Sequence, residues 1–340
     1  MNIRTWSATL CCAMAGLLAA PVAAAQAERL EASDIARFWT AYDAIRANAD
    51  PAEKRRILLR DYIEPGTPGL QAFMQAKGYT PECYLQAIER YPKFWASVRA
   101  GTLALAGKAA DAPQRIETLR ALYPPLRPAT IYFAIGCLNS SGTTLGDKVL
   151  IGAELAGGGP ETDVSEMAEA RRTNLGRFFA TRPSDGLPLL LVHEYVHTQQ
   201  KGPGPTLLAQ AVYEGAADFV AERVAGQLPP LDYASYGPRN EARLKRDFRA
   251  EMYDAGYDKW LYNAPDPRYG VRDLGYYMGY AIVRDYYARA ADPQRALREI
   301  VELDCTDQAA VDAFVQRSGF YSEAELRAAA KAARAATPAR

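Results

Sequence analysis

The run Leu191-Val192-His193-Glu194-Tyr195-Val196-His197-Thr198 holds the only two histidines of this 340-residue chain, four residues apart. On an α-helix, side chains at this spacing lie one turn apart on one face, so both imidazoles can bind a single zinc ion. Glu194 would then lie beside a water molecule on the metal, where a carboxylate can accept its proton. The pattern therefore predicts a helix that carries a zinc-dependent hydrolase site. The alternative, a pair of core histidines beside a glutamate, would bury polar groups at a high cost.

Residues on either side of the motif set the limits of its helix. Ser184 or Asp185 can cap the N-terminus, and Pro188 suits the first turn. The run Lys201-Gly202-Pro203 then stops the helix. These signals together predict a helix around both histidines.

A catalytic zinc needs a third protein ligand, and no histidine remains to provide it. The ligand must be a carboxylate, a cysteine or a tyrosine, and the metzincin pattern is excluded because Pro203 occupies the place of its third histidine. Helical spacing over residues 206–225, up to Gly226, places Glu214 and Asp218 one turn apart. If Glu214 reaches the zinc, Asp218 can accept the other ring N–H of a ligating histidine. The alternative is an exposed acidic pair.

The two motifs His-Glu-x-x-His and Glu-x-x-x-Asp resemble those of the gluzincin group of zinc metallopeptidases. Within that group, the chain is similar to a bacterial family of predicted zinc-dependent proteases without an established substrate, through the runs VHEYVHTQQ (192–200), EGAAD (214–218) and GYYMGY (275–280). The similarity covers roughly residues 130–287 and is specific at the first two runs. It implies a zincin-like fold, with His193, His197 and Glu214 as zinc ligands and Glu194 as the general base.

The chain departs from well-studied gluzincins in one respect that concerns catalysis. Those enzymes often add a downstream histidine that stabilises the oxyanion, and this chain has none. Tyr276 and Tyr280 recur on one face of a predicted helix, and a phenol O–H is a known oxyanion donor. The alternative is that this aromatic stripe is core packing. Arg272 and Arg284 are further candidates, each with the alternative of a surface or ion-paired arginine.

The N-terminal residues 1–27 have the pattern of a cleaved secretory signal peptide. One basic residue, Arg4, precedes an uncharged run rich in Ala and Leu, and an A-x-A type cleavage region ends near Ala27. A permanent anchor is the alternative, but the apolar run is short, so no stable membrane anchor is expected. The mature chain is therefore predicted to be periplasmic or secreted.

Three cysteines remain after cleavage, Cys83, Cys137 and Cys305. In an oxidising compartment this number allows one disulfide plus one free thiol, with the pairing left open, and three free buried thiols are the alternative. The whole chain has 40 basic and 40 acidic residues, without a basic block that contains aromatics. Nucleic acid is therefore not an expected partner.

The fold class predicted from these patterns is α+β and mostly helical. Residues 28–125 form a helical region whose helices begin at typical capping or first-turn signals, at Ser33, Asp50, Thr67, Thr80 and Asp111. A proline cluster at residues 123–128 separates it from a zincin-like catalytic region, residues 126–340, that ends in helices. Within that region, residues 130–135 and 148–155 are expected to pair as a long hairpin in a small antiparallel sheet. Residues 149–155 could also bind an extended substrate by backbone pairing, unless they form an ordinary protected edge.

The function predicted from the sequence is zinc-dependent hydrolysis of a peptide or protein substrate. Zn²⁺ would activate water, and Glu194 would transfer the proton. Two alternatives remain, a zinc-stabilised binding or assembly protein of the cell envelope without turnover, and an amidase that acts on cell-wall peptide. The presence of Glu194 favours an enzyme, because a binding site has no need for a base.

Overall fold

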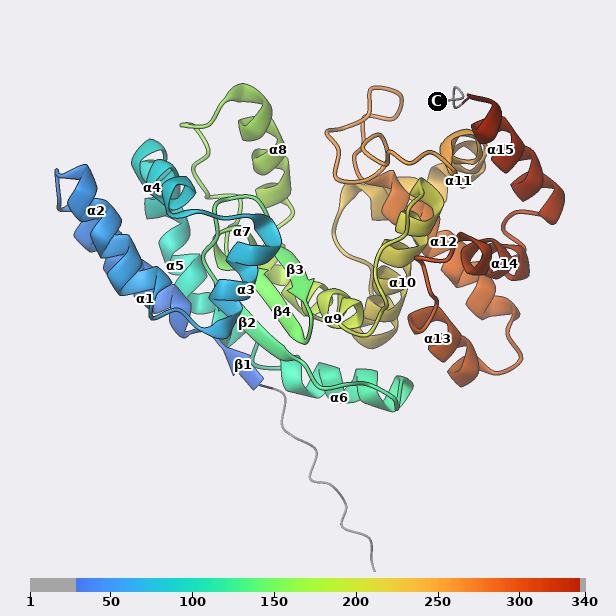
Figure 1. Ribbon diagram of the computed structural model, residues 1–340, viewed down its shortest axis with the longest axis horizontal. Coiled ribbons are helices and arrows are strands. Elements are labelled where there is room, and N and C mark those ends of the chain that lie inside the picture. Colours follow the sequence, from blue (N-terminus) through green and yellow to red (C-terminus); the bar gives the residue numbers. More distant parts are fainter. Residues whose placement is uncertain (1–28, 337–340) are drawn as a thin grey trace, which may run out of the picture.

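The computed structural model describes residues 29–336, and they form a mostly helical α+β structure with one four-stranded sheet. The signal peptide predicted for residues 1–27 lies outside the described residues. Figure 1 shows two groups of elements, one around the sheet and one around α10 (Leu207–Ala225) and α12 (Leu274–Arg289). The motif helix α9 (Leu187–His197) lies between the two groups and packs against both.

The N-terminal region is helical, as predicted. Its elements are α1 (Ser33–Arg46), α2 (Pro51–Leu58), the π-helical segment η1 (Leu59–Ile63), α3 (Pro68–Lys77), α4 (Pro81–Arg90), α5 (Pro92–Lys108) and α6 (Ala112–Leu122). Asp50, Thr67 and Thr80 cap α2, α3 and α4 by accepting backbone N–H groups, each followed by a proline in the first turn. Ser33 begins α1 without capping it, and α5, which no capping side chain precedes, was not predicted.

The sheet is mixed, so the predicted antiparallel sheet is wrong. Its strands are β1 (Arg29–Glu31), β2 (Thr130–Ala134), β3 (Gly142–Leu145) and β4 (Lys148–Gly152), in the order β1-β2-β4-β3. The first two pairs are parallel, and only β3 and β4 are antiparallel. The linker between the two predicted strands contains Thr143 and Thr144, and it forms β3. The hairpin therefore joins β3 to β4 through Gly146, at φ 60°, and β2 meets β4 in parallel.

The two predicted regions share this sheet. β1 belongs to residues 28–125 and pairs with β2, which follows the proline cluster. Helices α1 and α3 also pack against β2. The cluster at residues 123–128 is thus the connection between α6 and β2.

Three elements lead from the sheet to the motif helix α9. They are α7 (Ala153–Ala156), α8 (Glu169–Ala180) and the 3₁₀ segment η2 (Pro183–Asp185). The predicted caps Ser184 and Asp185 are wrong, because both lie in η2, and Gly186 occupies the N-cap position of α9 without a capping side chain. Pro188 does lie in the first turn of α9, as predicted.

Helix α10 forms the centre of the C-terminal group. It begins after Thr206, whose hydroxyl accepts the Ala209 N–H, and ends at Gly226 in the left-handed conformation, as predicted. All its residues from 207 to 221 are buried. Gly215 and Gly279 meet backbone of the facing helix where a Cβ would collide, so α10 and α12 pack at close range. The remaining helices are α11 (Asp232–Glu251), α13 (Pro293–Val301), α14 (Gln308–Ser318) and α15 (Glu323–Ala336).

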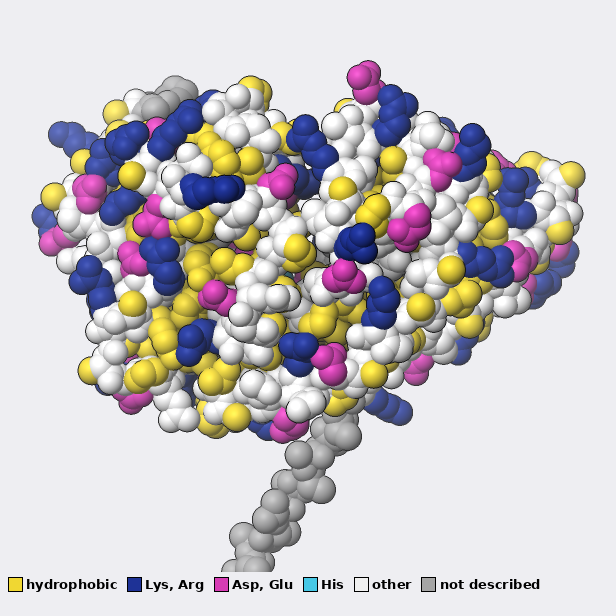
Figure 2. All heavy atoms as spheres, turned by 180° about the vertical axis from the view of Figure 1, so that it is seen from behind, with side chains coloured by type: hydrophobic (Ala, Val, Ile, Leu, Met, Phe, Trp, Pro, Cys, Tyr) yellow, Lys and Arg dark blue, Asp and Glu magenta, His cyan; other side chains and the backbone are white. Residues whose placement is uncertain are grey.

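The cysteines follow one of the two predicted alternatives. Cys83 of α4 forms a disulfide with Cys137, which follows β2, and Cys305 is a buried free thiol. Between residues 29 and 336, no helix has the length and apolar character needed to cross a membrane. Figure 2 shows the face opposite to that of Figure 1, where basic and acidic side chains are interspersed and no histidine is visible.

Candidate metal centre

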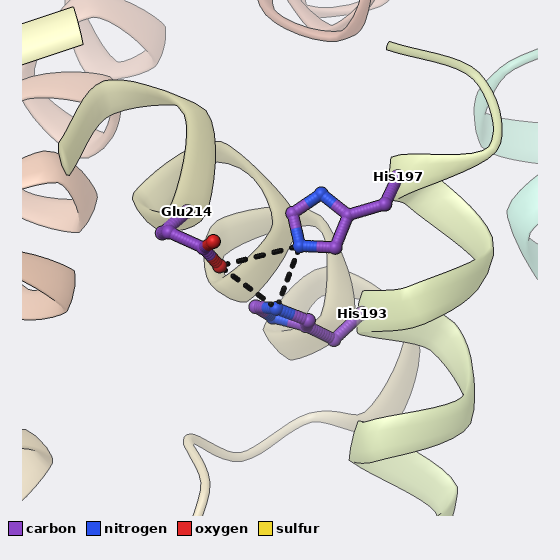
Figure 3. Close-up of side chains that lie close together, drawn as sticks. All are labelled: His193, His197 and Glu214. Carbon is purple, nitrogen blue, oxygen red and sulfur yellow. Dashed lines mark hydrogen bonds and ion pairs between the residues drawn. The ribbon is translucent and has the colours of Figure 1, made fainter. Parts of the chain in front are cut away.

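His193, His197 and Glu214 bring three ligand atoms together between α9 and α10 (Figure 3). The Nε2 atoms of the two histidines are 3.0 Å apart. Oε2 of Glu214 lies 3.3 Å from Nε2 of His193 and 3.2 Å from Nε2 of His197. Ligands at zinc–N and zinc–O distances of about 2.0–2.2 Å in a tetrahedron are roughly 3.3–3.5 Å apart. Two imidazoles and one carboxylate at these separations could therefore hold a metal ion, and the donor set suits zinc.

Each imidazole is oriented by a side chain on its far nitrogen. Nδ1 of His193 lies 2.9 Å from Oδ1 of Asp218, as the Glu-x-x-x-Asp spacing predicted. Nδ1 of His197 lies 2.6 Å from Oε1 of Gln200, whose amide donates to the Tyr213 carbonyl. With Nδ1–H donating to these oxygens, both Nε2 lone pairs face the centre.

Four side chains behind the ligands, two tyrosines and two glutamines, were missed by sequence reasoning. The Tyr233 hydroxyl donates to Oδ2 of Asp218 over 2.8 Å, and the Tyr262 hydroxyl donates to Oε1 of Glu214. Gln210 also donates to Oε1, which leaves Oε2 of Glu214 to the histidines. Both tyrosines come from segments after α10, and no local pattern marks either of them. Gln200 could have been found, because it lies one turn beyond His197.

Charge and burial act against each other at the ligands. Burial alone would raise the pKa of Glu214, but the adjacent imidazoles of His197 and His193 outweigh it and hold that pKa well below its usual range. Burial would lower the pKa of His193, but Asp218 and Glu214 outweigh it and raise that pKa well above its ordinary value. Without a metal ion the group therefore binds a proton, which a metal must displace.

Glu194 contributes a carboxylate to the same place without being one of the three ligands. Its side chain is buried, with the residue 7% exposed, and it lines a cavity of about 450 Å³ that also contains His193 and Asp218. Burial raises the pKa of Glu194. A carboxylate in this position could accept and return a proton.

The structure separates the two predicted tyrosines. Tyr276 lines the cavity, with its ring centroid 6.2 Å from that of His193, and it stacks on Tyr233. The Tyr280 hydroxyl instead donates to Glu222 over 2.7 Å, away from the ligand atoms. One helical turn advances the chain by about 5.4 Å, and the cavity meets only the first turn of α12. The structure therefore does not bring Tyr280 to the site.

The two arginine candidates are separated in the same way. Arg272 lines the cavity and pairs with Asp273, its neighbour in the chain. Arg284 pairs with Glu241 and Asp285, and it does not line the cavity. Each arginine is ion-paired, which was the alternative given for both.

The strand next to the cavity is β3, so the prediction that residues 149–155 could pair with a substrate is wrong. β4 is hydrogen-bonded to β2 on one side and to β3 on the other, and α7 begins at Ala153. β3 pairs on one side only and is the edge strand at this end of the sheet, with β1 at the other. At its start, Gly142 lies against Glu194, and an added Cβ would be 2.6 Å from Oε1 of that carboxylate.

The three side chains that could hold a metal ion, and the adjacent carboxylate of Glu194, come from two consecutive helices. Comparisons with protein-family models, curated proteins and solved structures found no match.

Proposed function

We propose that this chain is a zinc-dependent peptidase with a gluzincin-type centre in a zincin-like fold. One observation carries the proposal, namely that the buried carboxylate of Glu194 lines the same cavity as His193 of the metal-binding group but is not part of that group. A site that only binds a metal or a partner needs no such group. Buried carboxylates cost free energy unless they are paired or used, which favours a role in proton transfer.

The residues of the site divide the work of hydrolysis between them. His193, His197 and Glu214 would hold the zinc, which when bound acts as a Lewis acid toward the scissile carbonyl and the attacking water. Glu194 accepts a proton from that water and returns it to the leaving amine. Asp218 and Gln200 keep the imidazoles in orientation. The Tyr276 hydroxyl is the donor that we assign to the carbonyl oxygen as it gains negative charge.

We also propose that the mature protein acts in the periplasm or outside the cell on an extended peptide. The Cys83–Cys137 disulfide supports an oxidising compartment. The free edge of β3 beside Glu194 supports pairing with an extended backbone, in place of the strand predicted from the sequence.

Glu194→Gln tests the proposal. We expect the variant to retain stoichiometric zinc and an unchanged Tm, because Glu194 is not a ligand, and to lose at least about 10²-fold in kcat on quenched-fluorescence peptides. His193→Ala should lose the zinc itself. Glu222→Gln, on α10 and directed at Tyr280, is the control and should retain both zinc and activity.

The outcomes separate the proposed peptidase from the two alternatives. Full activity of Glu194→Gln would contradict the assigned base. A wild-type protein that holds zinc but cleaves no peptide would favour the binding or assembly protein. Cleavage confined to cell-wall peptide would identify the amidase.

A further inference from the structure

A second hollow, of about 630 Å³, adjoins the metal cavity. Its walls come from the end of α3, from residues 137–139 after β2, and from α8. Lys77, Asn139 and Asn174 line both hollows, so the two lie side by side. Among the described residues, two cations, Lys77 and Arg171, and no carboxylate line the second hollow. We call it the basic subsite.

Lys77 is half-buried and stands without a counter-ion. Within residues 29–336, its ammonium group has no carboxylate at ion-pair distance and no hydrogen-bond partner. Burial lowers the pKa of Lys77, and the charges of Glu194 and Glu214 act in the opposite direction. Lys77 is thus within electrostatic reach of the metal centre, across the cavity from α9. A partly desolvated ammonium without a partner is costly, and an anion that entered the hollow would relieve the cost.

The wall beside Lys77 is held in place by hydrogen bonds and a disulfide. Arg171 donates to the Leu138 carbonyl over 2.6 Å, and Leu138 is held at φ 62°. Behind the wall, the fully buried carboxylate of Glu154 accepts the N–H groups of Gly136 and Leu138. The Cys83–Cys137 disulfide fixes the same segment to α4. A pocket with fixed walls and two cations is pre-organised for a charged group.

We propose that the basic subsite binds a carboxylate of the peptide substrate next to the bond that is cleaved. The proposal rests on the proposed peptidase function and names its substrate class, peptides with an anionic group near the scissile bond. Lys77 supplies the ammonium, since it lines both hollows, and Arg171, which lines the second hollow alone, supplies a guanidinium. The carboxylate can come from an acidic side chain or from a free C-terminus, since both present the same two oxygens.

Peptide binding tests this without turnover. The first set of probes is a series of alanine-based hexapeptides with one Glu, placed at each position in turn, and each peptide is matched with one that has Gln at the same position. The second set is the all-alanine hexapeptide with a free C-terminus and the same peptide with an amidated C-terminus. Their Kd values are measured by calorimetry on zinc-loaded Glu194→Gln protein, alone and combined with Lys77→Gln, Lys77→Arg or Arg171→Gln. Lys54→Gln is the control, because Lys54 pairs with Glu89 and does not line either hollow.

We expect one acidic member of the set to bind at least about tenfold more tightly than its neutral partner, as a charge-assisted contact in a partly buried site gives. A preference for Glu at one position shows that the bound carboxylate is a side chain. A preference for the peptide with a free C-terminus shows that it is the terminal carboxylate. Lys77→Gln should remove the preference, Lys77→Arg should retain it, and Arg171→Gln should reduce it. Zinc content should stay unchanged in all of them, and Tm should stay unchanged in the two Lys77 variants, whose side chain makes no hydrogen bond or ion pair.

Two results would overturn the inference. One is equal binding of every acidic and neutral pair, and the other is a Lys77→Gln variant that weakens both members of a pair equally. Failure of the peptidase proposal is a different result, in which wild-type protein with zinc does not cleave a peptide that the Glu194→Gln protein binds with the expected preference. That result would leave the basic subsite supported and reject the hydrolysis.

Discussion

Glu214 divides its two carboxylate oxygens between two sets of partners. Oε2 faces both histidines, while Oε1 accepts hydrogen bonds from Tyr262 and Gln210. Tyr262 is 52% exposed and adopts φ 56°, which is uncommon for an aromatic residue. Backbone strain of this kind clusters at functional sites, and here it accompanies a hydroxyl that holds a metal-binding carboxylate in place.

Tyr276 and Tyr280 also differ in what they face, since Tyr276 lines the cavity and Tyr280 is directed at Glu222. We expect Tyr276→Phe to lower kcat by roughly 10²-fold, or about 3 kcal/mol of transition-state stabilisation, with zinc content unchanged. Tyr280→Phe is the control on the same helix and should retain full activity, since its hydroxyl bonds to Glu222. Steady-state kinetics and metal analysis of both variants decide the matter. If both variants are fully active, Tyr276 is a packing residue and another group stabilises the oxyanion.

Among the elements, β3 places its first residue, Gly142, against Glu194, the proposed general base. An alanine at Gly142 would put a Cβ 2.6 Å from Oε1 of Glu194 and 2.9 Å from Leu190, so the carboxylate must shift. We expect Gly142→Ala to retain zinc and to lose at least about tenfold in kcat, because proton transfer depends on position. Gly107→Ala, in α5 where an added Cβ meets nothing, is the matched control. An unchanged kcat in Gly142→Ala would show that Glu194 tolerates displacement.

How much the sequence predicts also differs from element to element. The limits of α10 and the contact between His193 and Asp218 follow from local rules, since caps, breakers and i, i+4 spacing act within a few residues. The mixed sheet does not, because strand order depends on which distant segments meet. Tyr262 and Lys77 reach the cavity from other parts of the chain, so tertiary packing alone brings them there. The identity of the metal and the catalytic role of Glu194 stay predictions.

For the molecule as a whole, the charges at the centre set how metal binding depends on pH. The raised pKa of His193 stabilises the metal-free fold below the unfolded pKa of histidine, about 6.5, and this contribution is lost as the pH rises through the folded value. Zinc requires the neutral imidazole of His193, so protons compete with zinc for this side chain. The competition begins above neutral pH and grows as the pH falls. Glu214, with a lowered pKa, stays anionic and does not add to the competition in that range.

We therefore expect the gain in Tm on adding zinc to be largest at about pH 8.5 and to shrink steadily toward about pH 5.5. The measurement is thermal unfolding with zinc and with a chelator across this range. His193→Ala serves as the reference, because it should show no gain at any pH. A gain in Tm that does not change with pH would contradict the assignment of His193 as a ligand that must lose its proton.

The three metal-binding side chains all come from two consecutive helices, α9 and α10, whereas α3, α8 and the segment before β3 form the opposite wall of the cavity. In evolutionary terms, the capacity to hold a metal and the shape of the surface that meets a ligand are encoded in separate stretches of the gene. Mutations in the stretches that encode the wall can then change which ligands fit the cavity without altering the three side chains that could hold the metal.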